Sequence, residues 1–163
     1  YGIVRGFYRL EPATIPASDH RYAATLDGFD RYAEQLSLRQ LQETEKFSLL
    51  VTGGSAVSKN GVRFGKGHGY FDFEWAVLSE LGLTDSSSVV ADVVHDCQFV
   101  NEVMPAEKHD VVVDWVITPT QKIHIDQSSR QRGRVFWEIV PGTEFAELGI
   151  VAELRDIQNL GPL

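Results

Sequence analysis

The chain has 163 residues, of which 43% are hydrophobic and 23% charged, a composition that suits one soluble α/β domain, 1–163, with a sizeable core. A formal net charge of −8 excludes a generally basic surface, so we expect neither nucleic acid nor a membrane as a partner. No apolar run approaches the roughly 20 residues of a membrane span, and a single cysteine, Cys97, excludes an internal disulfide and favours a cytoplasmic protein.

The first third of the chain reads as irregular structure around one strand and one short helix. We expect a strand over 1–10, a loop over 11–19 because of its two prolines, and an irregular segment with one turn of helix over 20–35. Ser37 is a candidate N-cap with Gln40 three residues on, so a short helix should follow and reach about Glu45. The opening residues read like the middle of a fold, and we expect an N-terminal part to precede Tyr1.

Compact apolar runs predict four strands, at 47–52, 88–94, 110–118 and 135–140, and the first of them should be buried. Between the first two, 55–60 reads as a loop ending in an Asn60–Gly61 turn. Apolar residues spaced three and four apart predict a helix over 70–81, with Gly82 as its stop. The range 142–159 predicts a terminal helix that is broken near Gly149.

This order of strands, loops and helices predicts an α/β layered domain with a largely parallel sheet, because the strands are apolar throughout instead of alternating. In such sheets ligands bind where the strands end at their carboxyl edges. Three polar clusters fall at such ends, namely 53–72, 95–98 and 118–120. We therefore expect the three clusters to lie at one edge of the sheet.

The stretch 60–74 combines alternating glycines with cations and carboxylates. Its members of interest are Gly65, Gly67, Gly69, Arg63, Lys66, Asp72 and Glu74. Glycine lets backbone N–H groups approach a ligand, two nearby cations suit an anion, and a following carboxylate suits a metal ion that accompanies the anion. The stretch indicates a phosphate-binding loop that runs into a helix. The alternative is a tight glycine turn whose charges face water.

Together with a second block, this stretch resembles the 5-formyltetrahydrofolate cyclo-ligase family, also called 5,10-methenyltetrahydrofolate synthetase. The family pattern Gly-x-Arg-Leu-Gly-x-Gly-x-Gly-Tyr-Tyr-Asp is similar to 61–72. The second block is Pro105, His109–Asp110, Val113–Asp114 and Ile117–Thr118. The resemblance covers about 1–120, leaves 121–163 as a C-terminal extension, and looks closest to a divergent bacterial branch.

The resemblance implies a three-layer α/β/α fold with a mostly parallel sheet, similar to the cyclo-ligase and NagB-RpiA-CoA transferase-like fold. It also implies ATP-dependent, Mg²⁺-assisted cyclisation of 5-formyltetrahydrofolate to 5,10-methenyltetrahydrofolate, with ADP and phosphate released. In that reaction the formyl oxygen attacks the γ-phosphate, a second folate nitrogen closes the ring, and phosphate leaves. The partners would then be a reduced folate and a nucleotide.

Residue by residue, the resemblance assigns ATP to Arg63, Phe64, Gly65, Lys66, Gly67, His68, Gly69, Tyr70 and Phe71. It assigns the folate to Lys66, Gly67, His68, Gly69 and Tyr70, and Mg²⁺ to Asp72 and Asp110. Arg63 and Lys66 would be catalytic, because cations there screen the charge that develops on the phosphate.

Two departures from the family pattern keep other functions open. Phe71 stands where the family has a second tyrosine, and 1–28 holds no match to the lysine and arginine that the family uses for ATP. A non-catalytic homologue that binds folate or a nucleotide is one alternative. A same-fold enzyme that acts on another phosphorylated metabolite is the other.

Seven further residues receive structural expectations. His95 and Asp96 follow a strand and could bind folate or metal, or could cap the strand end, and the sequence favours neither. Trp75 is expected in the core, and Asp114 is expected to bind a neighbouring backbone group or Arg63. Arginines 130, 132 and 134 are expected to face solvent.

Overall fold

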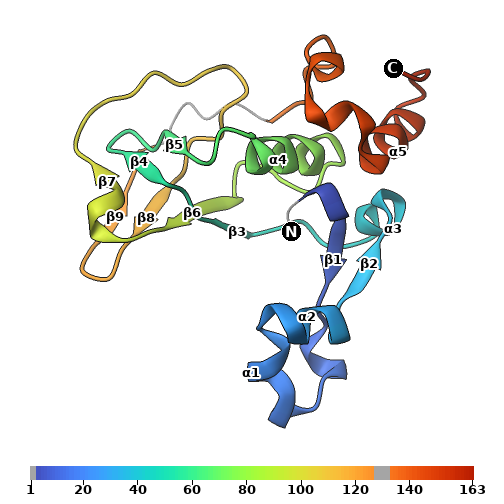
Figure 1. Cartoon of the computed structure of the whole chain (residues 1–163), viewed down its shortest axis with the longest axis horizontal. Coiled ribbons are helices and arrows are strands. Elements are labelled where there is room, and N and C mark those ends of the chain that lie inside the picture. The colour runs from blue at the N-terminus through green and yellow to red at the C-terminus, as the bar shows by residue number, and fades with distance from the viewer. Residues whose placement is uncertain (1–2, 127–132) are drawn as a thin grey trace. The chain divides into compact units, whose positions relative to one another are not determined.

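The computed structural model describes residues 3–126 and 133–163, and the chain divides into two compact units (Figure 1). Unit 1 combines the two ends of the chain, Tyr1–Glu43 and Glu147–Leu163, and unit 2 is the continuous range Thr44–Ala146. Arginines 130 and 132 lie outside the described residues. Among the described helices, none is both long and apolar enough to cross a membrane.

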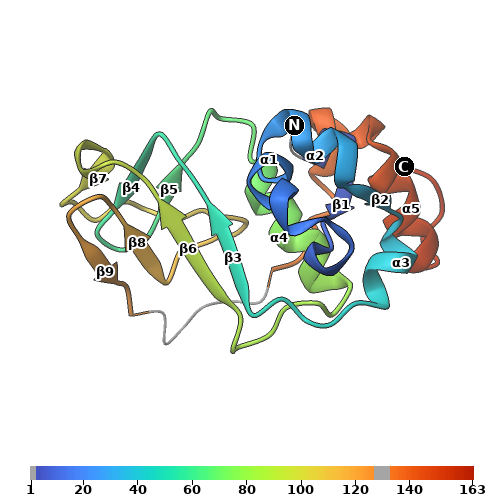
Figure 2. The same cartoon turned by 90° about the horizontal axis from the view of Figure 1, so that it is seen from below.

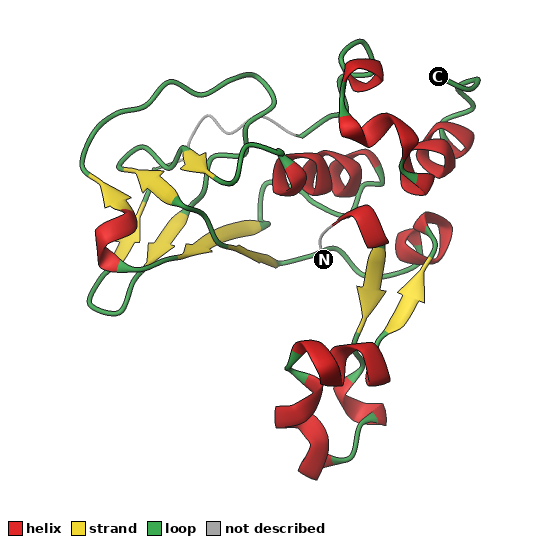
Figure 3. Cartoon of the chain, viewed as in Figure 1, coloured by secondary structure: helices red, strands yellow, loops and turns green. Residues whose placement is uncertain are grey.

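Unit 1 contains a two-stranded antiparallel sheet and short helices (Figure 3). Its strands are β1 (Phe7–Arg9) and β2 (Glu34–Leu36). Its helices are η1 (Ile3–Arg5), η2 (Pro12–Thr14), η3 (Ala17–Asp19), α1 (His20–Ala23), α2 (Leu26–Tyr32), α3 (Leu38–Gln42) and α5 (Gly149–Ile157). The expected strand at 1–10 is thus confined to three residues, and two 3-10 turns occupy the expected loop at 11–19.

The irregular segment expected at 20–35 is wrong, because α1 and α2 occupy most of it. Thr25 caps α2 by accepting a hydrogen bond from the backbone N–H of Gly28 at 3.2 Å. An added Cβ at Gly28 would lie 1.8 Å from the carbonyl oxygen of Tyr22, so only glycine allows the two helices to approach this closely. Gly28 is therefore a packing residue between the two helices.

The capping box at Ser37 and Gln40 is confirmed, since each side chain accepts a hydrogen bond from the other's backbone N–H. Helix α3 ends at Gln42, slightly before the expected Glu45. Glu153 on α5 accepts a hydrogen bond from the backbone N–H of Leu38 at 2.8 Å. This bond ties the start of α3 to the C-terminal helix.

Unit 2 is built on the four-stranded sheet β3-β6-β8-β9, in which the first three strands are parallel and the last is antiparallel (Figure 2). These strands are β3 (Leu49–Thr52), β6 (Val89–Val93), β8 (Trp115–Ile117) and β9 (Lys122–His124). A three-stranded sheet, β5-β4-β7, combines β4 (Ala56–Ser58), β5 (Arg63–Phe64) and β7 (Phe99–Val100). The expected α/β class with a mostly parallel sheet is confirmed.

The strand predictions hold to different degrees. The range 88–94 contains β6, whereas only the last part of 110–118 pairs, as β8. Strand β3 is buried on one face alone, with Leu49 and Val51 54% and 60% exposed. The loop expected at 55–60 contains β4 instead, and the turn expected after it is confirmed by a φ of 81° at Gly61.

Helix α4 (Tyr70–Glu80) confirms the predicted helix of unit 2. Its apolar residues are buried, Trp75 at 4% exposure and Val77 at 0%. Gly82 follows the end of the helix as expected, with a φ of 77° and a backbone N–H that donates to the carbonyl of Ser79.

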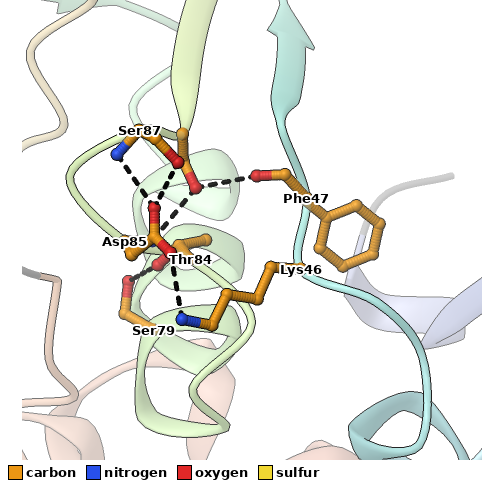
Figure 4. A network of polar contacts seen from close by, with 7 residues as sticks. Lys46, Phe47, Ser79, Thr84, Asp85 and Ser87 are labelled. Carbon is orange, nitrogen blue, oxygen red and sulfur yellow. Dashed lines mark hydrogen bonds and ion pairs between the residues drawn. The ribbon is translucent and has the colours of Figure 1, made fainter.

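A polar network after α4 joins the starts of β3 and β6 (Figure 4). Asp85 accepts hydrogen bonds from the backbone N–H of Ser87 at 2.8 Å and from Lys46 at 3.0 Å. Ser88, which precedes β6, donates to the carbonyl of Phe47, which precedes β3, at 2.7 Å. These bonds join the starts of the two strands. Because the strands are parallel, their carboxyl ends lie at the same edge of the sheet.

No strand forms at 135–140, so that prediction is wrong. The backbone N–H of Val135 donates to Glu80 on α4 at 3.1 Å, and Phe136 packs with only 8% exposure. The apolar residues of this segment are thus buried without a strand partner. The segment continues into η5 (Val140–Gly142) and η6 (Glu144–Glu147), and the break expected near Gly149 falls between η6 and α5.

Candidate functional site

The three polar clusters expected at the sheet edge do lie together. Asp96, after β6, accepts hydrogen bonds from the hydroxyls of Thr118 and Thr120, which follow β8. Gln98 donates to the carbonyl of Gly54, which follows β3, at 2.7 Å. Through these bonds the carboxyl ends of the three parallel strands form one polar rim.

His95 and Asp96 use their side chains for this local structure. His95 is the N-cap of η4 (Asp96–Gln98), and its backbone N–H donates to the side chain of Gln98 at 2.7 Å. Two threonine hydroxyls hold the pKa of Asp96 below its usual value. The structure therefore supports the capping interpretation of this pair.

The glycine loop has backbone conformations that favour glycine. Gly67 has a φ of 88° and Gly69 a φ of 68°, both in the left-handed region, and no atom lies within 4 Å of a Cβ added at either position. Gly69 is the N-cap of α4, and no side chain caps that end of the helix. The residue at the N-cap of α4 therefore supplies no side-chain acceptor to the first N–H groups, beside an open stretch of loop, which is an arrangement that suits an anion.

Beneath the loop lies a buried ion pair. Arg63 on β5 places Nη2 3.3 Å from Oδ2 of Asp72, and 6% and 18% of the two side chains are exposed. The guanidinium also lies over the ring of Phe71, 4.9 Å from its centre. An added Cβ at Gly65 would lie 3.5 Å from Nη1 of Arg63, so the loop passes directly beside this cation.

Asp72 is held from a second side by the segment before β8. The backbone N–H of Val111 donates to its Oδ1 at 2.9 Å. Burial raises the pKa of Asp72, and the negative charge of Asp110 adds to the increase, whereas Arg63 opposes it. The glycine loop and the second sequence block thus meet at this carboxylate.

Glu144 binds both His68 of the glycine loop and Tyr70 at the start of α4. It accepts hydrogen bonds from Tyr70 at 2.8 Å and pairs with Nδ1 of His68 at 2.7 Å. The rings of His68 and Tyr70 stack in parallel with their centres 5.0 Å apart. These bonds lower the pKa of Glu144 and raise that of Tyr70.

A pocket of about 290 Å³ opens beside His68, one of the two residues that Glu144 binds. Its floor comes from the loop and α4, with Gly67, His68 and Asp72 among its lining residues. The opposite wall comes from the segment after residue 132, with Phe136 and Phe145. Phe145 stacks on Phe73 of α4 with the ring centres 4.4 Å apart, which gives the pocket an aromatic side.

Buried side-chain nitrogen and oxygen atoms without a hydrogen-bond partner are confined, in the described part of the chain, to two residues. They are Nε of Arg63 and both carboxylate oxygens of Asp92. Asp92 lies on β6, between Thr52 and Val116 in register, and is 0% exposed. Burial raises its pKa to about 6, and the charge of Arg63 opposes the increase.

The range 10–119 matches the model of the 5-formyltetrahydrofolate cyclo-ligase family. The chain belongs to this family. The family match contains the glycine loop, α4 and the carboxylates at 72 and 110, whereas Glu144 and the aromatic wall lie beyond it.

Related proteins carry the name methenyltetrahydrofolate synthase domain-containing protein. The zebrafish protein (Danio rerio) is 30% identical over 142 residues, which are 85% of this chain and 36% of the relative. The mouse protein (Mus musculus) is 31% identical over 138 residues, and the human protein 38% identical over 106 residues, or 63% of this chain. The chain spans about a third of the length of these relatives, and the expected bacterial branch stays a prediction.

The residues that the cyclo-ligase resemblance assigns to ATP and folate differ in where they lie in the structure. Gly67, His68 and Gly69 line the pocket, whereas Lys66 is exposed at the loop and Arg63 is buried below it. Phe64 is 41% exposed on β5. Their roles stay predictions.

The sequence reasoning missed Asp92, Glu144 and the aromatic wall. Asp92 sits among valines and had one visible signal, a lone carboxylate inside an apolar strand. Glu144 and Phe145 had none, because only the folded chain brings them to the loop.

The Mg²⁺ expected at Asp72 and Asp110 would depend on the carboxylate oxygens that these two residues offer. No group of three or more His, Cys, Asp or Glu side chains that could hold a metal occurs within 3–126 and 133–163. The two carboxylates are close enough for one to raise the pKa of the other, and carboxylate oxygens are the donors that Mg²⁺ prefers. They fit a cation that binds mainly through nucleotide phosphates and takes only one or two protein ligands.

Proposed function

We propose that the chain carries the catalytic domain of an ATP-dependent 5-formyltetrahydrofolate cyclo-ligase, which forms 5,10-methenyltetrahydrofolate and releases ADP and phosphate. The observation that carries the proposal is the left-handed glycine loop at the uncapped start of α4, beside Asp72 and within the family match. The geometry supports an anion site, and the family supports the substrate class.

In this proposal each part of the loop has a task. The N–H groups at Gly67 and Gly69 bind phosphate oxygens, and Lys66 neutralises the charge that grows on them during transfer. Asp72 and Asp110 would hold Mg²⁺, which would supply neutralisation of the phosphate charge. Arg63 supplies a second positive charge from below.

The pocket beside the loop would hold the folate. Its aromatic side, with Phe136 and Phe145, suits a flat heterocycle, and His68 offers a ring nitrogen at the boundary with the loop. The pocket excludes water from the bond that forms, which limits hydrolysis of the activated formyl group.

A direct assay tests the proposal. The full-length protein is mixed with ATP, Mg²⁺ and 5-formyltetrahydrofolate, and the absorbance of the methenyl product is followed. We expect an increase that requires ATP and that Lys66→Ala reduces strongly, while Lys59→Ala, an exposed lysine of the turn after β4, leaves it unchanged. A wild-type protein that produces no ATP-dependent increase would overturn the proposal.

A second candidate is a non-catalytic homologue that keeps the binding site. It is favoured by Phe71, whose ring lies under Arg63 where the family has a tyrosine with a hydroxyl group. Calorimetry separates the two functions, because a non-catalytic homologue binds ATP or the folate without forming product.

A further inference from the structure

Two buried carboxylates lie within reach of the charge of Arg63, and only one of them binds it directly. Asp72 accepts from Nη2, whereas Nε has no partner. Both oxygens of Asp92 also lack a partner, although the residue is 0% exposed. Buried charged groups without partners are costly, so such a pair of unmatched groups in one region requires an explanation.

The path of the chain brings Arg63 to the end of the strand that neighbours Asp92. Thr52, the last residue of β3, is the register partner of Asp92. Two residues later, an added Cβ at Gly54 would lie 3.0 Å from Cγ of Arg63. The residues beside Asp92 on β3 and β8, Thr52 and Val116, carry no charge, whereas the charge of Arg63 opposes the rise in the pKa of Asp92 that burial causes.

We propose that Asp92 is a positioning residue, which holds the guanidinium of Arg63 when Asp72 turns to its ligand. The proposal rests on the proposed function for the identity of that ligand, a divalent cation that arrives with nucleotide phosphates. Asp72 cannot neutralise Arg63 and the cation equally well, because the cation takes carboxylate oxygens that the arginine now uses. Asp92 then supplies the negative charge that keeps Arg63 inside the protein.

The arrangement explains why an unpaired carboxylate is kept in the central strand. With Asp72 as its only anion, Arg63 would compete with the cation for the same oxygen. With Asp92 in the same region, the arginine exchanges one carboxylate for the other and stays inside the protein.

The first test requires no ligand. The titration of Asp92 is followed by carbon NMR of the aspartate carboxyl groups, assigned with Asp92→Asn. In Asp72→Asn, Arg63 is released toward Asp92, and the apparent pKa of Asp92 should fall from about 6 by about one pH unit or more. The matched control is Asp110→Asn, which also removes a negative charge near Asp72 but leaves the pair with Arg63 in place.

The second test uses ATP and Mg²⁺. In Asp92→Asn, Arg63 stays on Asp72, so the Mg²⁺ concentration that half-saturates ATP binding in calorimetry should rise by about threefold to tenfold. Asp114→Asn is the control, because Asp114 accepts a hydrogen bond at 2.6 Å from the backbone N–H of Val90, which lies on the same strand as Asp92.

The two tests separate the proposals. A wild-type protein that binds no ATP contradicts the proposed function, and the NMR titration then decides the role of Asp92 alone. An unchanged titration of Asp92 in Asp72→Asn overturns the positioning role, as does an equal shift in Asp110→Asn. A Mg²⁺ requirement that is the same in Asp92→Asn and wild type overturns it as well.

Discussion

The side chains of Arg63 and Asp72 form an ion pair that links β5 to the first turn of α4, with 3.3 Å between Nη2 and Oδ2. Exposure of only 6% and 18% separates it from the other arginine pairs described, such as Arg39 with Asp156, whose side chains are 63% and 72% exposed. The buried pair fixes the loop that runs between its two members.

Replacing Arg63 should therefore destabilise the protein. Arg63→Met leaves Asp72 buried without its cation, and we expect the free energy of unfolding to fall by about 3 kcal/mol. Arg39→Met, which breaks an exposed pair, should cost no more than about 0.5 kcal/mol. Urea denaturation of both variants measures the difference, and equal losses would contradict the interpretation.

Replacing Asp92 should stabilise the protein, in contrast to replacing Arg63. Its pKa of about 6 in the folded protein lies above the ordinary 3.8, so the unfolded chain loses the proton first and the folded state loses stability as pH rises from about 4 to 6. Asp92→Asn removes this penalty and should raise the free energy of unfolding at pH 8 by about 1 to 3 kcal/mol, with little change at pH 4. Denaturation curves at both pH values check the prediction, and a variant that is less stable at pH 8 would refute it.

The glycine loop is sensitive to an added methyl group for reasons of backbone conformation. Gly67→Ala places a side chain on a residue with a φ of 88° and should cost about 1 to 2 kcal/mol, although the space around it is open. Gly142→Ala, where no positive φ occurs and the space is equally open, should be tolerated. Thermal unfolding compares the two, and equal melting temperatures would argue against a strained loop.

Lys66 is the exposed cation of the loop, and its role is tested by affinity. Lys66→Ala should weaken ATP binding about tenfold or more, because a charge-assisted bond to phosphate contributes about 1.5 to 3 kcal/mol. Calorimetry at low salt measures the dissociation constant. Lys59→Ala, an exposed lysine at the turn after β4, should bind ATP like the wild type. Unchanged affinity in Lys66→Ala would exclude the residue from a phosphate site.

Glu144 controls the titration of Tyr70. The bond between them raises the pKa of Tyr70, so Glu144→Gln should return it toward its ordinary value of about 10. Ultraviolet titration of the phenolic groups, with Tyr70→Phe as the reference that identifies the signal, measures the change. If the titration curve of Glu144→Gln overlays that of the wild type, the hydrogen bond between Tyr70 and Glu144 does not form in solution.

The sequence predicted those parts of the fold that local chemistry determines. The capping box at Ser37 and the stop at Gly82 depend on residues a few positions apart, and both are where they were expected. The segment 135–140 has the composition of a strand, yet α4 and Glu80 supply its partners, which no local pattern reveals. Tertiary packing therefore overrode propensity at this position.

The candidate site was likewise predictable from the sequence only in part. The loop at 65–69 was visible because its glycines report a backbone conformation, and family resemblance supplied its meaning. Asp92, by contrast, became visible only when burial and the missing partner of Arg63 were known together. A carboxylate in an apolar strand has many explanations until its surroundings are known.

Unit 1 joins the two ends of the chain, and this has a consequence during synthesis on the ribosome. The backbone N–H of Leu38 donates to Glu153, so α3 gains this partner only after all of unit 2 has been translated. Synthesis from the N-terminal side then gives unit 2 the first opportunity to fold, while residues 3–43 still lack the C-terminal helix of unit 1. A released chain that ends at residue 146 should accordingly protect unit 2 from protease and leave 3–43 open to cleavage.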